Sequence, residues 1–227
     1  MQRISFQKIL LYSSAILCIC GCITDLVLIY VFGNQVPGYS QLSHTLSSLG
    51  VSTSPVARAV TLWMVILGFI FLFFAFGFIH LFREYGRDAR RAFWLIILYS
   101  LGECIASGVF RADRVNGELA PVALLHDLFG GIGVTALLLL PLVMRSIFDA
   151  FRYPLFFRLS GIVFIAGICF TILFLFRMEY FANWVLHDYA GLWQRLFLVN
   201  YYIYFIAIAS MMIEKIKETK PQHTKAL

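Results

Sequence analysis

Long runs of apolar residues, separated by short polar connections, dominate this sequence. Six of these runs are about twenty residues long, the length that a helix needs to cross a ~30 Å hydrocarbon core. An isolated strand cannot satisfy its backbone in lipid, so each run is expected to be a helix. The runs lie near residues 10–32, 58–82, 92–110, 123–144, 159–177 and 192–213. The pattern predicts an all-α polytopic membrane protein with six transmembrane helices, in one domain over residues 1–213 followed by a cytoplasmic tail at 214–227.

The composition excludes an ordinary soluble domain. Hydrophobic residues make up 61% of the 227 residues and charged residues 13%, with a mean hydropathy of +0.84, whereas soluble domains are nearer half apolar. The net charge of +6 would suit nucleic acid, but the bases lie in short connections beside apolar runs, where topology explains them. We therefore expect membrane lipids as partners and no nucleic acid, and the sequence names no protein partner.

The distribution of Lys and Arg predicts the orientation. Thirteen of the 18 bases fall on one side of the six-helix arrangement. The other side holds Arg58, Arg111, Arg114, Arg177 and Arg195. Because basic residues collect on the cytoplasmic side of a membrane, both termini are expected in the cytoplasm.

The longest polar interruption in the first half of the chain is Pro37–Gly50, with one histidine and five Ser or Thr hydroxyls. It lies on the predicted extracytoplasmic side, where two later connections also carry polar groups. Asp25 and Glu103 lie inside apolar runs, roughly 10 Å below that surface at 1.5 Å per residue, and carboxylates at that depth need a polar interior or a partner. These groups predict one outward-facing pocket. Its candidate residues are His44, Ser47, Asp113, His126 and Arg195, with Asp25 and Glu103 beneath and Arg195 as the first candidate partner of either acid.

Three helix starts are expected to converge on this side. Helix N-termini carry unpaired N–H groups and partial positive charge, which favours an anionic or carbonyl-bearing ligand. The hydroxyls of the first connection have an alternative use as helix caps. The tryptophans lie near predicted helix ends, as in an interfacial aromatic belt, and are assigned no role in the site.

A metal site is an alternative, because three of the five histidines lie on the same side. His44, His126 and His187, or two of these with Asp113, would supply ligands that zinc accepts. Zinc would activate a bound water, and Ser47 would orient a substrate carbonyl. The competing interpretation makes each histidine a hydrogen-bonded interfacial residue. The sequence leaves both interpretations open, so the catalytic residues are unknown.

Four short motifs, taken in order, resemble a known family. They are Tyr39–Gly50 (YSQLSHTLSSLG), Phe110–Asp113 (FRAD), His126 and Gly191–Arg195 (GLWQR). They are similar to the multi-spanning bacterial membrane proteins filed as domain of unknown function 998, over nearly the whole chain. Ser47-Ser48 stands where that family typically has a serine followed by an acid. The resemblance implies a six-helix protein of the bacterial inner (plasma) membrane and no established activity.

A weaker likeness is to the membrane hydrolases of the ceramidase and adiponectin-receptor type, which hold zinc with Ser, Asp and His side chains in a helix bundle. This chain has those residue types near one face but lacks their paired H-x-x-x-H on a late helix.

Three functions follow as ranked hypotheses. The first is a pocket that binds a lipid head group or a small polar molecule. The second is a zinc-dependent hydrolase acting on a lipid ester or amide, with zinc as its cofactor. The third is an ion- or proton-coupled transporter in which Asp25, Glu103 and Arg195 form a relay, although no apolar run has the central Gly or Pro break typical of transporter sites. A structural partner without a ligand is a fourth.

Overall fold

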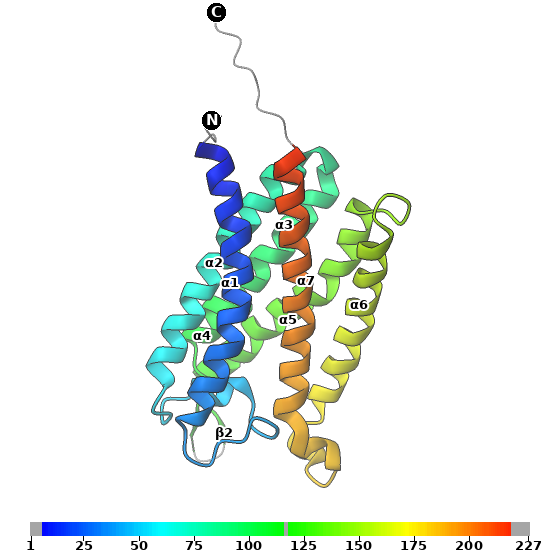
Figure 1. Cartoon of the computed structure of the whole chain (residues 1–227). Helices are drawn as coiled ribbons and strands as arrows, with labels where there is room; N and C mark the ends of the chain where they lie inside the picture. Colours follow the sequence, from blue (N-terminus) through cyan, green and yellow to red (C-terminus); the bar gives the residue numbers. More distant parts are fainter. Residues whose placement is uncertain (1–5, 116–117, 219–227) are drawn as a thin grey trace, which may run out of the picture.

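The protein is a bundle of long helices (Figure 1). The structure is a computed structural model that describes residues 6–115 and 118–218. The long helices are α1 (Phe6–Asn34), α2 (Ala57–Phe82), α3 (Gly86–Tyr99), α5 (Pro121–Ile147), α6 (Pro154–Leu175) and α7 (Ala190–Glu218). The short elements are the 3₁₀-helices η1 (Leu46–Leu49), η2 (Arg83–Tyr85), η4 (Glu179–Phe181) and η5 (Val185–Tyr189), the π-helix η3 (Ser100–Ala106), α4 (Ser107–Val109), and the antiparallel pair β1 (Arg114–Val115) and β2 (Glu118–Leu119).

The helical fold class is confirmed in the described chain, where the strands β1 and β2 are an antiparallel pair of two residues each. The helix α7 continues to Glu218, into the predicted tail of residues 214–227. Residues 219–227 lie outside the described residues.

Five helical segments of the described chain are long and apolar enough to cross a membrane. One of them, Ala57–Val109, has 53 residues and contains a reversal. The chain turns at η2 and Gly86, whose φ of +57° is a conformation that glycine adopts without steric cost. After this turn α3, η3 and α4 pack back along α2, and Gly68 of α2 lies directly against Ile105 of η3.

The helices pack against one another in sequence order around a ring. Contacts join α1 to α2, α2 to α3, α3 to α5, α5 to α6 and α6 to α7, and α7 closes the ring on α1. The first described residue of α1 and the last of α7 lie at the same end of the bundle, which we call the terminal end (Figure 1). The opposite end, called the loop end, carries η1, the β1–β2 pair, η4 and η5.

The π-helix η3 continues α3 and packs closely against α5. A π turn inserts one extra residue into a helix and is frequent at functional sites. Here it sets Gly102 and Glu103 against α5: a Cβ placed on Gly133 would lie 2.7 Å from the backbone nitrogen of Glu103. Small residues permit this approach between helices. The consequence is that Glu103 enters the bundle beside α5.

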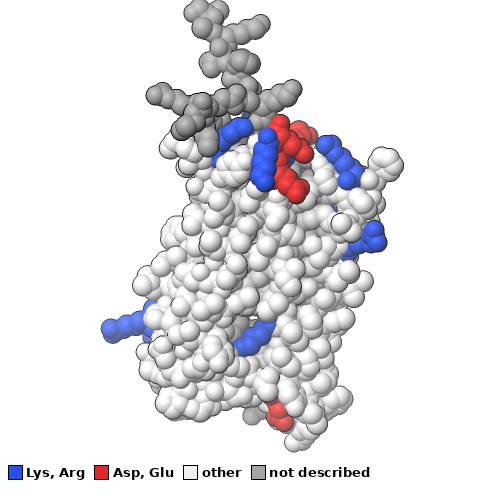
Figure 2. All heavy atoms as spheres, in the orientation of Figure 1, with Lys and Arg blue, Asp and Glu red and all other residues white. Residues whose placement is uncertain are grey.

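The interior of the bundle is aromatic. Phe71 of α2 packs on Phe205 of α7, with ring centroids 4.6 Å apart, and Tyr99 of α3 stacks on the same Phe205 at 5.6 Å. Large apolar side chains also face outward along the helices, as expected for surfaces that meet lipid. Figure 2 shows the charged side chains of the visible face gathered mainly at the terminal end, above a wide band with few charges.

Candidate functional site

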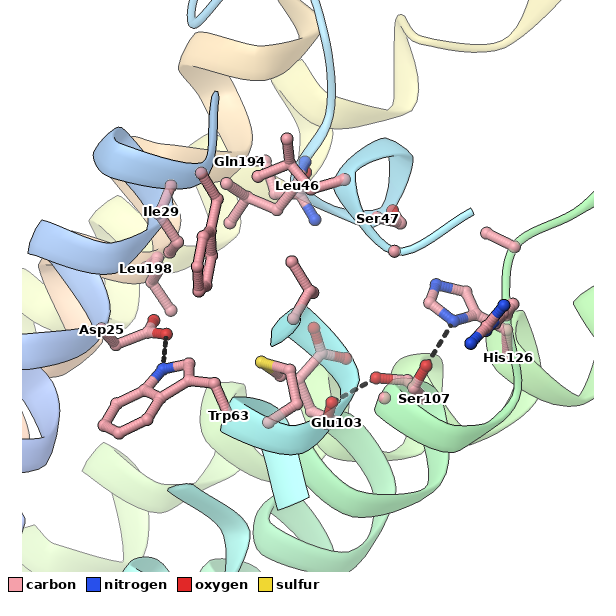
Figure 3. Close-up of a pocket in the computed structure, with 18 of the residues that line it drawn as sticks. Asp25, Ile29, Leu46, Ser47, Trp63, Glu103, Ser107, His126, Gln194 and Leu198 are labelled. Atoms are coloured by element: carbon pink, nitrogen blue, oxygen red, sulfur yellow. Dashed lines mark hydrogen bonds between the residues drawn. The ribbon is translucent and has the colours of Figure 1, made fainter. Parts of the chain in front are cut away.

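A cavity of about 100 Å³ lies inside the loop end of the bundle (Figure 3). Side chains from α1, η1, α2, α3, η3, α4, α5 and α7 meet around it. Its polar lining residues are Asp25, Ser47, Trp63, Tyr99, Glu103, Ser107, Arg111, His126, Gln194 and Tyr202. Four of the seven residues predicted for one pocket therefore share this cavity: Asp25, Ser47, Glu103 and His126.

Asp25 of α1 is held by two neutral donors. The indole Nε1–H of Trp63 donates to Asp25 Oδ1 at 2.6 Å, and the hydroxyl of Tyr202 donates to Oδ2 at 2.7 Å. The residue is only 2% exposed. Burial of a carboxyl group is costly unless its oxygens are hydrogen-bonded, and these two donors fix both of them in place. The bonds join α1 to α2 and α7 at the depth of the cavity.

Glu103 contrasts with Asp25, because its carboxylate makes no hydrogen bond or ion pair with any residue that the structure describes. Its backbone oxygen accepts a short hydrogen bond from the hydroxyl of Ser107. Its side chain lies over α5, where a Cβ on Gly130 would come 3.0 Å from Glu103 Oε2. The carboxylate lines the cavity and supplies an uncommitted acceptor to it.

His126, in the second turn of α5, is oriented by the chain that precedes that helix. Its Nδ1 lies 2.8 Å from the carbonyl oxygen of Ser107 and 2.9 Å from that of Phe110. Both carbonyls can only accept, so Nδ1 carries the proton and donates to them, which leaves Nε2 as the acceptor of the neutral ring. The arrangement assigns the tautomer and links α5 to Ser107 of α4 and to Phe110, which follows α4.

The first loop is fastened to α7 by side chains of that helix. The Leu46 N–H, at the start of η1, donates to Gln194 Oε1 at 2.7 Å. This contact places Ser47 and Gln194 together on the loop side of the cavity (Figure 3). Gln194 is a lining residue that the sequence analysis did not select.

Arg195 does not partner either buried acid, so that prediction was wrong. Its guanidinium donates instead to the Tyr39 hydroxyl at 2.6 Å, to Gln41 Oε1 at 2.9 Å and to the His44 carbonyl at 3.0 Å. The residues around it, Tyr39, Gln41, His44 and Gly191, form what we call the Arg195 cluster. Burial raises the pKa of the Tyr39 hydroxyl, against the opposing effect of the adjacent Arg195 charge. Arg195 thus ties the first loop to α7 outside the cavity, since it is not a lining residue.

His44 and Asp113 also lie outside the cavity lining. The Nδ1 of His44 accepts from the Ser40 N–H at 3.0 Å, and its ring stacks on Tyr39. Asp113 accepts from the Ser52 N–H at 2.7 Å and from the Ser52 hydroxyl at 2.6 Å, and these bonds hold its pKa below the usual range. Arg111 donates to the same hydroxyl at 3.0 Å. Asp113 therefore joins the first loop to the segment after α4.

The histidines proposed for a zinc site are held separately. His44 lies in the Arg195 cluster, His126 lines the cavity, and His187 Nδ1 contacts the Phe176 carbonyl at 3.0 Å. In the described parts of the chain, no three His, Cys, Asp or Glu side chains are grouped so that they would hold a metal ion. The arrangement therefore gives the zinc hypothesis no ligand set built from His44, His126, His187 and Asp113.

Trp63, Tyr99, Ser107 and Tyr202 were missed by the sequence analysis. Trp63 was assigned to an interfacial belt, yet its indole N–H points into the bundle and binds Asp25. The useful signal was the need of a deep carboxylate for hydrogen-bond donors at its own depth. Tyrosines within the apolar run of α7, such as Tyr202, meet that need.

The ring of apolar helices and the polar interior at one end define a multi-pass helical membrane protein. Within that class, the chain belongs to the family described as "Protein of unknown function (DUF998)", whose sequence model matches residues 19–211. The resemblance inferred from the short motifs is thereby confirmed. No curated protein and no solved structure matches the chain. The likeness to ceramidase-type hydrolases stays a prediction.

Proposed function

We propose that this protein binds a small polar molecule, or the polar head group of a lipid, in the cavity at its loop end. The observation that carries the proposal is the carboxylate of Glu103, which has no hydrogen bond or ion pair with a described residue, in a cavity whose other acid, Asp25, has a donor on each carboxylate oxygen. A polar group held inside an apolar bundle without a partner is costly, so such groups in membrane proteins are functional candidates.

The size of the cavity limits the ligand. Pockets for drug-sized molecules are about 300–1,000 Å³, and this cavity has about 100 Å³. It suits a compact molecule, or a lipid head group whose acyl chains remain outside the bundle. Ser47, Gln194 and His126 would supply hydrogen bonds beside Glu103.

The proposed topology has six crossings, with both termini in the cytoplasm. The reversal at Gly86 divides Ala57–Val109 into two antiparallel arms, which raises the five apolar segments to six crossings. The excess of bases at the terminal end favours the cytoplasm for that end. The cavity would then face the extracytoplasmic side of a bacterial inner membrane.

Ion- or proton-coupled transport is a second candidate, favoured by one observation: both deep carboxyl groups, Asp25 and Glu103, line the same cavity. In this version Arg195 has no part in the relay, because its donors are committed to the Arg195 cluster. Hydrolysis remains a hypothesis, for which the described residues offer no metal-ligand set.

Native mass spectrometry of the detergent-purified protein tests the binding proposal. We expect the wild-type chain to retain a bound lipid or small molecule, and Ser47→Leu, which fills the cavity, to lose it. Ser43→Leu is the matched control, because Ser43 lies exposed in the same loop and does not line the cavity. Equal occupancy in the two variants would contradict the proposal.

A further inference from the structure

We infer that the ligand of the cavity is an organic cation: an ammonium group carried by a lipid head group or by a free amine. The inference rests on the proposed function and names the chemistry that the same cavity would select. It differs from the expectation of an anionic or carbonyl-bearing ligand, which came from helix N-termini and not from the groups that line the cavity.

The charges around the cavity are the first argument. Two acids, Asp25 and Glu103, line it with a single Lys or Arg residue, Arg111. The guanidinium of Arg111 donates to Ser52 Oγ, which in turn donates to the carboxylate of Asp113. Arg111 is therefore engaged with the loop network, and the deeper lining offers acids without a basic side chain.

The hydrogen bonds of the two acids point the same way. Asp25 receives two neutral donors, and Glu103 has no partner among the described residues. In a low-dielectric interior a carboxyl group is either neutral or needs an opposite charge close to it. The charge of Arg177 acts on Glu103 without an ion pair between the two described residues. An ammonium group in the cavity would supply a closer charge to Glu103, while an anion would be repelled by the ionised acids.

The aromatic walls favour an organic cation over a bare metal ion. Phe32, Trp63, Tyr99 and Tyr202 line the cavity together with the acids. Aromatic rings attract an ammonium or trimethylammonium group through their electron-rich faces. Hard metal ions instead need several oxygen ligands at about 2.0–2.6 Å, and the described residues contain no such group of three acids, histidines or cysteines.

Choline chloride and its uncharged isostere 3,3-dimethylbutan-1-ol test the inference directly. The full chain is placed in phosphatidylglycerol nanodiscs, and ligand binding is measured by the rise in unfolding midpoint with ligand concentration. We expect choline to raise the midpoint and the isostere to leave it unchanged. Equal binding of the two probes would overturn the inference without any variant.

Substitutions test whether Glu103 is the residue that pairs with the cation. Glu103→Gln is expected to weaken choline binding at least tenfold, with the helix content and elution volume of the wild type. Asp127→Asn is the control: Asp127 is exposed, neighbours His126 in the chain and does not line the cavity. Unchanged choline affinity in a folded Glu103→Gln protein would overturn the inference. Should that variant not fold, the isostere comparison decides.

Two further experiments distinguish a lipid head group from a free amine as the ligand, and test the binding function separately from the cation inference. Phosphatidylethanolamine in the nanodisc would raise the apparent Kd for choline if a lipid head group is the ligand, and would leave it unchanged if the ligand is a free amine. A midpoint shift with glycerol phosphate but not with choline would end the cation inference and keep the binding function. No shift with any probe, and no bound molecule in native mass spectrometry, would end both.

Discussion

Trp63 of α2 donates its indole N–H to the carboxylate of Asp25 on α1, with Nε1 and Oδ1 2.6 Å apart. The bond lies inside the bundle and orients Asp25, the cavity acid that has two hydrogen-bond donors. Together with Tyr202 it makes Asp25 a junction between α1, α2 and α7.

Removal of the indole donor should therefore destabilise the bundle. Trp63→Phe leaves Asp25 with one buried donor, and an unsatisfied buried group costs about 1–3 kcal/mol. The free energy of unfolding in mixed micelles should fall by that amount. Trp94→Phe is the matched control, since Trp94 is 60% exposed. An equal loss in both variants would mean that the indole ring matters and the hydrogen bond to Asp25 does not.

The close approach of η3 and α5 predicts opposite results at two neighbouring glycines. A Cβ on Gly133 would meet the backbone of Glu103, whereas a Cβ on Gly131 has no atom within 4 Å. Gly133→Ala should cost about 1–3 kcal/mol through overpacking, while Gly131→Ala should be neutral or stabilise by up to ~1 kcal/mol. Unfolding in mixed micelles measures both. Similar values for the two variants would contradict the close contact.

The Arg195 cluster should order the first loop. Arg195→Lys keeps the charge but loses the planar fork that reaches Tyr39, Gln41 and the His44 carbonyl together. Amide hydrogen exchange across 37–50 should accelerate about tenfold. Arg58→Lys, at an exposed position, should leave these rates unchanged. If the first loop keeps its protection in Arg195→Lys, charge alone holds the loop.

The hydrogen bonds from Ser52 to Asp113 predict that the contact between the first loop and the segment after α4 depends on pH. Its pKa is lowered by hydrogen bonds from Ser52, so the ionised form is favoured in the folded protein. The contribution to stability is fully present above the usual pKa of 3.8 and is lost as pH falls through the lowered value. Protection of the Ser52 amide should therefore persist at pH 5 and disappear in stronger acid. Asp113→Asn should show weaker protection without this acid-dependent loss, and an unchanged acid transition there would assign it to another group.

The six-crossing topology predicts opposite accessibility for two connections. Phe151 lies between α5 and α6 and is 98% exposed, and Tyr180 lies between α6 and α7 and is 89% exposed. In a background without the native cysteines, Tyr180→Cys should react with a membrane-impermeant maleimide added to intact cells. Phe151→Cys should react only after the membrane is opened. The reverse pattern would invert the proposed orientation.

The helices were predictable because their residues must be apolar on whichever side meets lipid, and this leaves long uninterrupted runs in the sequence. Asp25 and Glu103 could be singled out because each is a lone charge inside such a run. Both acids line the cavity. These inferences depend on the rise per residue of an α-helix, which varies little.

The partners of these acids were not predictable in the same way. Arg195 was chosen for its charge, but the carbonyl of His44 and the side chains of the first loop lie within reach of its guanidinium. Which of these groups the guanidinium of Arg195 binds depends on the conformation of the first loop, and no periodic sequence pattern encodes that conformation. The same reason explains His44, His126 and His187, which share one side in sequence but point to different local carbonyls or amides.

The π-helix η3 makes the position of Glu103 sensitive to chain length as well as to residue type. Successive residues of an α-helix are turned by about 100°, and the π turn accommodates one residue more than an α turn would. A single-residue deletion within Ser100–Ala106 would restore the α-helical count and rotate one flank of the segment relative to the other. Length variation at this point would thus rotate Glu103 relative to the cavity without replacing any lining side chain.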